Sequence, residues 1–363
     1  MMSRAGENKP AGKRWALAGL AVLSLLQYRV TILIHGSHFG QLVDATRGVT
    51  TGEPHWRGYQ NRVLGPYAAE FLDSISGLGL EIIVLLAMMS LPMVQNLVFF
   101  LLTRRLTGDT SVAFSYTVFF AAAFLGLQDA NWLYLWDYLD LIVFTVFLYG
   151  VLARRSTLWF VAVFVVGVLN RESALLIGVW MFLDAVVVET KEGAIRPGLR
   201  SPRRALTGAS LVVVGTLVVE GLRRLLFESA AGASAGVEQI PLGPLGMTRL
   251  NHNLSTLVDS IFAPTLLMPL AVTAALIVVP IWVLTRLRDC DRNLLPIALT
   301  FLVAWAGNLV FGLVDESRVH LWLVPFPLFL HLGLMHMLTT AEAGDSPAGD
   351  PAAGAPRPSS STT

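Results

Sequence analysis

The sequence predicts an all-α protein, a polytopic transmembrane helical bundle of about ten spans with both termini cytoplasmic. Hydrophobic residues make up 54% of the 363 residues and charged residues only 14%. The mean hydropathy is +0.63, and the apolar residues are gathered in long runs. Such a chain has more apolar surface than one core can bury, so we expect lipid to be its solvent.

The candidate spans are runs that approach the roughly 20 residues a helix needs to cross the hydrocarbon core. They cover 15–34, 78–103, 110–127, 138–153, 157–169, 173–188, 206–222, 260–285, 294–313 and 319–339. The first run follows Arg4, Lys9, Lys13 and Arg14 and is too long for the core of a signal peptide. We therefore expect it to be a retained span.

The basic residues predict the orientation. With the N-terminus inside, the cytoplasmic connections hold about twice as many Lys and Arg residues as the outer ones, which favours an even number of spans in a bacterial-type inner membrane. We expect a basic cytoplasmic N-terminus (1–14), a single transmembrane domain (15–340) and a disordered cytoplasmic tail (341–363) rich in Ala, Gly, Pro and Ser. The expected outer-face loops are 35–77, 128–137, 223–259 and 314–318.

The first outer loop carries polar residues that are suited to binding or catalysis. Arg62 offers forked donors that suit phosphate oxygens, and Asp44 can act as a general base. His55 and Tyr59 are further substrate-binding candidates. An amphipathic stretch from 63 to 72 is expected to lie along the membrane interface. The alternative is a solvated loop whose arginines contact lipid headgroups.

Aromatic and acidic residues meet between the third and fourth runs. Asp137 and Asp140 are three residues apart, so a helix would place both on one face, close to Trp136. Aromatic rings beside carboxylates are typical of sugar sites. The same aromatic residues also fit an interfacial belt, and both interpretations stay open.

The sharpest signal is Asn170-Arg171-Glu172 between two short apolar runs. Charged residues in such a place are costly unless they are paired or hydrated, so they are functional candidates by default. We expect Arg171 to bind a phosphate and Glu172 to orient it or to act as an acid or base. The alternative is an outer turn closed by an Arg–Glu pair.

The last outer connection contains Asp315, Glu316 and Arg318. Adjacent carboxylates are suitable oxygen ligands for a divalent cation, which is the one cofactor that the sequence suggests. The alternative is a short solvated turn. Cys290 is the only cysteine, so an intramolecular disulfide is excluded and a thiolate metal cluster is not expected.

Two stretches, 59–66 (YQNRVLGP) and 169–173 (LNRES), are similar to segments of bacterial membrane proteins near the GT-C glycosyltransferases. The layout also resembles that superfamily, whose members take a sugar from a polyprenyl-phosphate carrier at the outer face. The resemblance implies an acidic pair in the first outer loop, one of whose carboxylates deprotonates the acceptor or binds a metal. Asp44 is the nearest candidate, and this sequence departs from the pattern because Asp44 has no acidic neighbour.

The resemblance leads to a specific hypothesis. A polyprenyl-phosphate-linked sugar would be held by Arg171 with Arg62 or Arg318, and the acceptor would be deprotonated by Asp44 or Glu172. The alternatives are a lipid-linked polysaccharide polymerase or ligase, a transporter or flippase, and a non-catalytic scaffold. The absence of Walker and dinucleotide motifs argues against ATP-driven pumping, and nucleic acid is not an expected partner.

Overall fold

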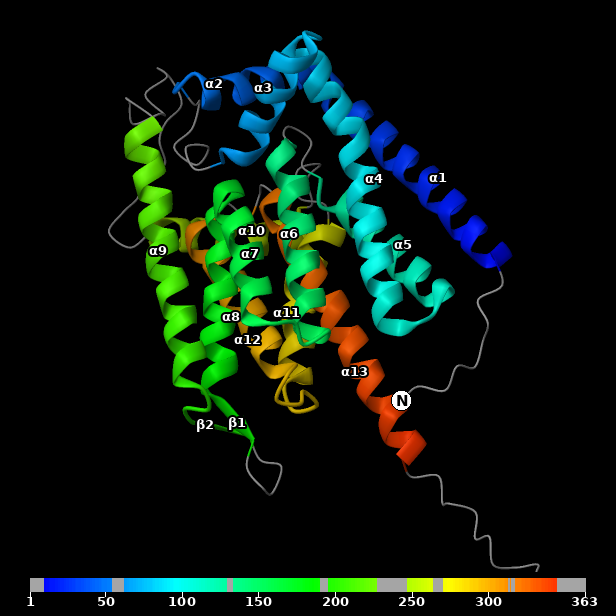
Figure 1. Cartoon of the computed structure of the whole chain (residues 1–363), viewed down its shortest axis with the longest axis vertical. Coiled ribbons are helices and arrows are strands. Elements are labelled where there is room, and N and C mark those ends of the chain that lie inside the picture. Colours follow the sequence, from blue (N-terminus) through cyan, green and yellow to red (C-terminus); the bar gives the residue numbers. More distant parts are fainter. Residues whose placement is uncertain are drawn as a thin grey trace, which may run out of the picture.

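The computed structural model describes residues 10–53, 62–128, 133–189, 195–226, 247–263, 270–312, 314 and 317–344, and most of them are helical (Figure 1). The α-helices are α1 (Pro10–His35), α2 (Phe39–Thr50), α3 (Leu64–Ser76), α4 (Leu80–Thr107), α5 (Thr110–Gly126), α6 (Leu135–Leu152), α7 (Thr157–Asn170), α8 (Leu175–Val186), α9 (Pro202–Leu226), α10 (Met247–Phe262), α11 (Leu270–Arg286), α12 (Leu295–Phe311) and α13 (Pro325–Gly344). Short 3₁₀ helices are η1 (Gly36–His38), η3 (Glu172–Ala174) and η5 (Ser317–Leu323).

The predicted all-α class is confirmed, with one small addition. Strands β1 (Val187–Glu189) and β2 (Ile195–Pro197) form an antiparallel ribbon in which Val187 faces Pro197. The sequence analysis did not expect strands there, because the segment is short, basic and interrupted by proline.

Each of the ten apolar runs lies largely in a helix. Five helical segments are long and apolar enough to cross a membrane, judged by length and composition. They are Arg14–Thr50, Leu80–Thr107, Leu135–Leu152, Pro202–Leu226 and Arg318–Met337. Other runs form shorter apolar helices. A membrane protein is thus the expected class, while the count of ten spans and the side of the termini stay predictions.

Helix α6 is the central element of the core. In its most apolar window 78% of the residues are buried, against 22% in α9. Phe144 and Phe147 of α6 pack against Phe326 of α13, and Phe147 also contacts Trp180 of α8. Because these contacts hold α6 in place, the side chains on its first two turns have fixed positions.

The outer helices turn apolar side chains away from the protein. Trp15 of α1 is 78% exposed and Leu206 of α9 is 69% exposed, which water would disfavour and lipid would not. Helix α1 is nevertheless anchored by polar contacts. The Asn96 amide of α4 donates to the Ser24 hydroxyl (3.0 Å) and to the Gln27 side chain, the kind of contact that joins helices in lipid.

The segment 35–77, expected as an outer loop, contains two helices in its described part. Figure 1 shows α2 and α3 at one end of the molecule and the β1–β2 ribbon at the other. Helix α3 exposes Tyr67, Phe71 and Ile75 along one stripe and buries Gly65 and Pro66. This pattern agrees with the amphipathic segment predicted there and suits a membrane interface.

Helices α8 and α9 lie side by side (Figure 1), and two glycines let their backbones meet. A Cβ at Gly208 would lie 2.6 Å from the Phe182 nitrogen and 2.7 Å from the Gly178 oxygen. Small residues allow such close approach between helices.

Gly208→Ala should therefore destabilise the protein by about 1–3 kcal/mol through overpacking, although alanine favours an isolated helix. Thermal unfolding in detergent measures the effect. Gly221→Ala on the same helix is the matched control, because nothing lies within 4 Å of its added Cβ. Equal melting temperatures for the two variants would contradict the close contact.

Cys290 lies between α11 and α12 and is buried. Burial raises the pKa of its thiol to about 11, and the nearby Asp291 and Asp289 add to the rise. Since the thiolate is the nucleophile, maleimide labelling of the folded protein should be slow at pH 8 and accelerate up to about pH 11. A rate that levels off near pH 8.5, as for a free cysteine, would contradict this environment.

Candidate functional site

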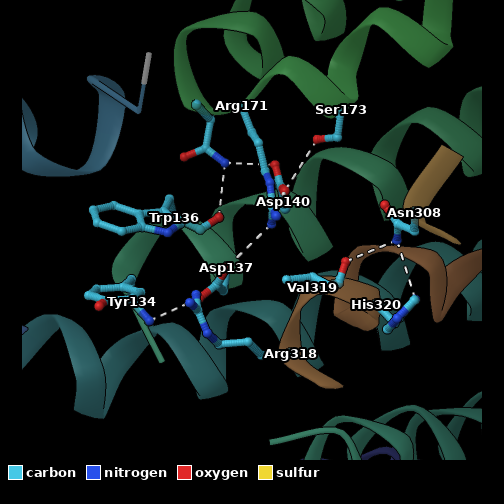
Figure 2. A network of polar contacts seen from close by, with 11 residues as sticks. Tyr134, Trp136, Asp137, Asp140, Arg171, Ser173, Asn308, Arg318, Val319 and His320 are labelled. Carbon is cyan, nitrogen blue, oxygen red and sulfur yellow. Dashed lines mark hydrogen bonds and ion pairs between the residues drawn. The ribbon is translucent and has the colours of Figure 1, made fainter. Parts of the chain in front are cut away.

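Predicted site residues from separate parts of the chain meet in one buried polar cluster (Figure 2). We call it the arginine–aspartate cluster. Its members come from the segment before α3, the first turns of α6, the α7–η3 junction and η5, and they are Arg62, Trp136, Asp137, Asp140, Asn170, Arg171 and Arg318.

Arg171 lies at the centre of the cluster. Its Nη1 is 3.4 Å from Asp137 Oδ1 and 3.3 Å from Asp140 Oδ2. Both aspartates are 1% exposed. Buried charges are costly unless they are paired, and this arrangement pairs each aspartate with the same guanidinium.

The chain reaches this position because α7 ends there. Asn170 is its last residue, and Arg171 follows in an extended conformation before η3 begins. The Asn170 amide nitrogen donates to the Asp140 carboxylate (2.8 Å) and to the Trp136 carbonyl (2.9 Å). Ser173 donates to the other Asp140 oxygen at 3.3 Å. These bonds join the helix break to the first turns of α6.

Asp137 also has a structural task. Its carboxylate accepts a hydrogen bond from the Tyr134 backbone nitrogen (3.0 Å) at the start of α6, which is one half of a capping box. The same carboxylate is 3.7 Å from Arg318 Nη1. Asp137 therefore links the helix terminus to η5 as well as to Arg171.

Two aromatic rings contact the arginines Arg62 and Arg318. The rings of Tyr134 and Trp136 stack with centroids 4.4 Å apart. The Arg62 guanidinium carbon lies 5.2 Å from the Trp136 ring, and that of Arg318 lies 5.0 Å from the Tyr134 ring. Cation–π contacts hold both arginines in defined positions, so the predicted aromatic residues serve the cluster directly.

His320 follows Arg318 on η5 and is buried. The Asn308 amide nitrogen donates to the Val319 carbonyl (3.2 Å) and lies 3.3 Å from His320 Nδ1. Because an amide nitrogen is a donor, Nδ1 accepts, and the proton of the neutral ring is on Nε2. His320 Nε2 is buried and has no hydrogen-bond partner among the described residues.

An apolar groove of about 400 Å³ has His320 in its lining. It runs between α5, α11, α12 and the η5–α13 segment, and His320 is the only ionisable group among the residues that line it. Side chains such as Phe119, Leu276 and Leu328 form its walls. His320 thus lines the apolar groove and is close enough to Arg171 for an electrostatic interaction.

The cluster is recessed. Helix α7 has 14 residues, so it is about 21 Å long, whereas the hydrocarbon core is about 30 Å thick. Helix α4, with 28 residues, is about twice as long. If the turn between α6 and α7 lies at one membrane surface, Arg171 lies within the hydrocarbon core and does not reach the opposite surface. Polar residues at such a depth need the pairing observed here.

The remaining predicted residues differ in their placement. Glu172 is half-buried and close enough to act electrostatically on Arg171. Asp44 lies on α2, where its exposed carboxylate is 3.5 Å from Arg47 of the same helix. Its predicted role as a base is untested by this arrangement. His55, Tyr59, Asp315 and Glu316 lie outside the described residues.

No role was predicted for Ser173, Asn308 or His320, whereas Tyr134 was among the aromatic residues expected in an interfacial belt or a sugar site. Asn308 gave a usable signal, because an asparagine within an apolar run is rarely without function. His320 lies two residues after the predicted Arg318, but no nearby residue in the sequence indicated a partner for it. The possible divalent-cation site at Asp315 and Glu316 stays a prediction, because both residues lie outside the described part of the chain.

Comparison with known proteins does not extend these predictions. No protein-family model matches the chain, and neither a curated protein nor a solved structure gives a match. The likeness to GT-C enzymes remains an expectation from the two short motifs.

Removal of Arg171 tests how the cluster is held together. Arg171→Ala leaves two buried carboxylates without their shared partner, which should cost about 3–5 kcal/mol of stability. The double variant Arg171→Ala/Asp140→Asn should recover part of that loss, because one uncompensated charge is removed. Chemical or thermal unfolding in detergent gives both values. Purely additive losses in the double variant would show that the two side chains are not coupled.

Proposed function

We propose that the protein is a membrane glycosyltransferase that binds a polyprenyl-phosphate-linked sugar and transfers the sugar at the outer face. The observation that carries the proposal is the pairing of an apolar groove with the buried arginine–aspartate cluster through His320, which lines the groove and interacts electrostatically with Arg171. A lipid-linked phosphate has the same two parts, an apolar chain and an anionic head.

The groove suits the chain of such a lipid. Its lining is apolar apart from His320, and Phe119 at its edge is 66% exposed. A prenyl chain could thus pass from the bilayer into the protein without meeting a charge. Ligand pockets that combine apolar walls with a few convergent polar groups are typical binding sites.

The cluster suits the phosphate. Three arginines (Arg62, Arg171 and Arg318) come together with Asp137, Asp140 and the half-buried Glu172, which acts electrostatically on Arg171. Arginine forks match phosphate oxygens, and the Nε2 proton of His320 adds a donor in the groove lining. Preorganised cationic donors in a dry site stabilise the negative charge of a departing lipid phosphate.

Asp140 is the proposed general base. In the transfer, the acceptor hydroxyl oxygen bonds to the anomeric carbon while the bond from that carbon to the phosphate oxygen breaks. Asp140 takes the hydroxyl proton, and the lipid phosphate leaves with the bonding electrons. Asp140 is preferred to Asp44 because it belongs to the cluster, where Asn170 and Ser173 orient its two oxygens.

Transport of the same lipid is the second candidate. It is favoured by the helix break at Arg171 between the short helices α7 and α8, because discontinuous helices form the substrate sites of many transporters. A Ser173→Cys variant in a Cys290→Ala background separates the two functions. Labelling by an impermeant reagent from the outer side alone favours the enzyme, and labelling from either side favours transport.

Binding is tested with Arg62→Gln and native mass spectrometry of the protein with added polyprenyl phosphate. The variant should lose about tenfold or more in affinity, because one charge-assisted contact is removed. Arg47→Gln is the control, since Arg47 is an exposed arginine at the same end whose carboxylate partner is on its own helix. Equal binding by both variants would contradict a phosphate site at the cluster.

The groove has its own test. Gly126 lines it, and a Cβ added there meets no atom within 4 Å, so Gly126→Phe should fill the groove without a backbone clash. We expect weaker binding of a long-chain polyprenyl phosphate and unchanged binding of a short-chain analogue. An equal loss for both lipids would argue against the groove as the chain site.

Catalysis is tested by comparing Asp140→Asn with Asp44→Asn in a sugar-transfer assay. Asp140→Asn should bind the lipid and reduce transfer by at least about 100-fold, the typical contribution of a general base. Asp44→Asn should retain activity. The opposite result would return the role of the base to Asp44.

A further inference from the structure

A second charged cavity lies at the other end of α6. It has a volume of about 200 Å³ and is lined by five arginines, of which Arg154 and Arg200 are exposed, and by a single acid, Asp184. Phe160 and Trp180 also line it. We call it the arginine cavity, and its arginines are Arg154, Arg155, Arg200, Arg204 and Arg292. From Asp140 to Leu152 along α6, the two sites are about 18 Å apart.

Among the described residues, Arg204 is the one arginine of the cavity with an ion pair inside it. Arg204 Nε is 2.9 Å from the Asp184 carboxylate, and its guanidinium lies 5.0 Å from the Trp180 ring. Arg155 donates to the Tyr149 hydroxyl at 3.0 Å. The Nε atoms of Arg155 and Arg292 are buried without a hydrogen-bond partner among the described residues. Buried donors of this kind normally have partners, so the cavity is short of an anionic acceptor.

The backbone at Arg154 points to the same conclusion. Arg154 has a φ of 51° and is the only non-glycine residue with positive φ among those described. It follows the last turn of α6, and the next backbone nitrogen, that of Arg155, donates to the Gly150 carbonyl. Glycine is the favoured residue at this type of helix terminus. An arginine here keeps its side chain at the cavity despite an unfavourable backbone conformation.

A larger and mainly apolar cavity adjoins the first. It has a volume of about 930 Å³ and shares Arg154, Arg155 and Asn293 with the arginine cavity. Its apolar walls include Val112, Leu152, Leu332 and Met335, and charged or ionisable side chains line the rest: Arg105, Asp109, Asp291 and His336. The two cavities together offer an anion-binding head region and an apolar region beside it.

We propose that the arginine cavity binds the phosphate of an anionic lipid whose chains occupy the adjoining apolar cavity. The chemistry recognised is a phosphate group, because arginine forks bind its oxygens in pairs. The apolar cavity favours a lipid over free phosphate as the source. This site is separate from the arginine–aspartate cluster and does not depend on the proposed glycosyltransferase activity.

The alternative is that these arginines only set the orientation of the helices in the membrane, and this alternative explains fewer of the observations. Basic residues that set orientation need only lie near the cytoplasmic surface, as the exposed Arg288 does. That explanation does not require arginines from separate connections to converge on one cavity lined by Trp180 and Phe160. It also does not explain the buried Nε atoms or the conformation of Arg154.

Native mass spectrometry of the full-length protein with equal amounts of phosphatidylglycerol and phosphatidylcholine tests the proposal. Wild type should retain phosphatidylglycerol about tenfold more strongly, and Arg155→Gln/Arg292→Gln should remove that preference. Arg288→Gln is the control, because it removes an exposed arginine of the same connection as Arg292 and should change nothing. Equal retention of both lipids by wild type, or an equal loss in Arg288→Gln, would overturn the proposal.

Two further measurements test the role of Arg154 and the source of the phosphate. Arg154→Gly should weaken phosphatidylglycerol retention while leaving the melting temperature equal or higher, because glycine relieves the backbone. Unchanged retention in this variant would count against the role of Arg154. Inorganic phosphate is the probe for the other source: if it binds at the cavity and wild type shows no preference for phosphatidylglycerol, the lipid assignment is wrong.

Discussion

The ion pairs that Arg171 makes with Asp137 and Asp140 determine how α6, α7 and η5 meet. A helix break carrying a charge is unfavourable inside an apolar bundle, and it becomes tolerable because the two carboxylates of α6 are placed beside it. Asn170 donates two further hydrogen bonds to the same part of α6, one to the Asp140 carboxylate and one to the Trp136 carbonyl. Once these contacts are made, Arg318 and His320 on η5 are brought to the same place, where His320 lines the apolar groove.

Helix α6 gives the molecule two chemically distinct ends. Its first turns carry aspartates that form ion pairs with arginines from other segments. The turn after its last residue carries Arg154 and Arg155, which line a cavity with one acid. Between the ends, α6 is packed by aromatic side chains. Each polar site adjoins an apolar cavity. Both sites therefore suit amphipathic ligands, and the rigid helix between them keeps them apart.

Much of this arrangement could be predicted from the sequence, and the limits have physical causes. The apolar runs predicted the helices because a long apolar composition is enough to indicate a helix of a membrane protein. Asn170 and Arg171 were singled out because charge between two short apolar runs is costly, and Asp137 and Asp140 because their spacing places both on one helix face close to Trp136. The contacts of Asp140 with Asn170 and Arg171 could not be predicted, since they depend on how α6 and α7 pack. From the sequence, the arginines of the arginine cavity predicted only the orientation of the helices in the membrane. Their convergence could not be predicted, because they come from separate parts of the chain. The groove at His320 is likewise a property of packing between four helices.

The most direct test of the account is a cryo-electron microscopy structure of the protein in lipid nanodiscs with polyprenyl phosphate. The account predicts a phosphate within hydrogen-bonding distance of Arg62 or Arg318, with the prenyl chain in the groove beside His320. A phosphate found only in the arginine cavity at the opposite end, or a groove filled by the protein's own side chains, would contradict the central claim.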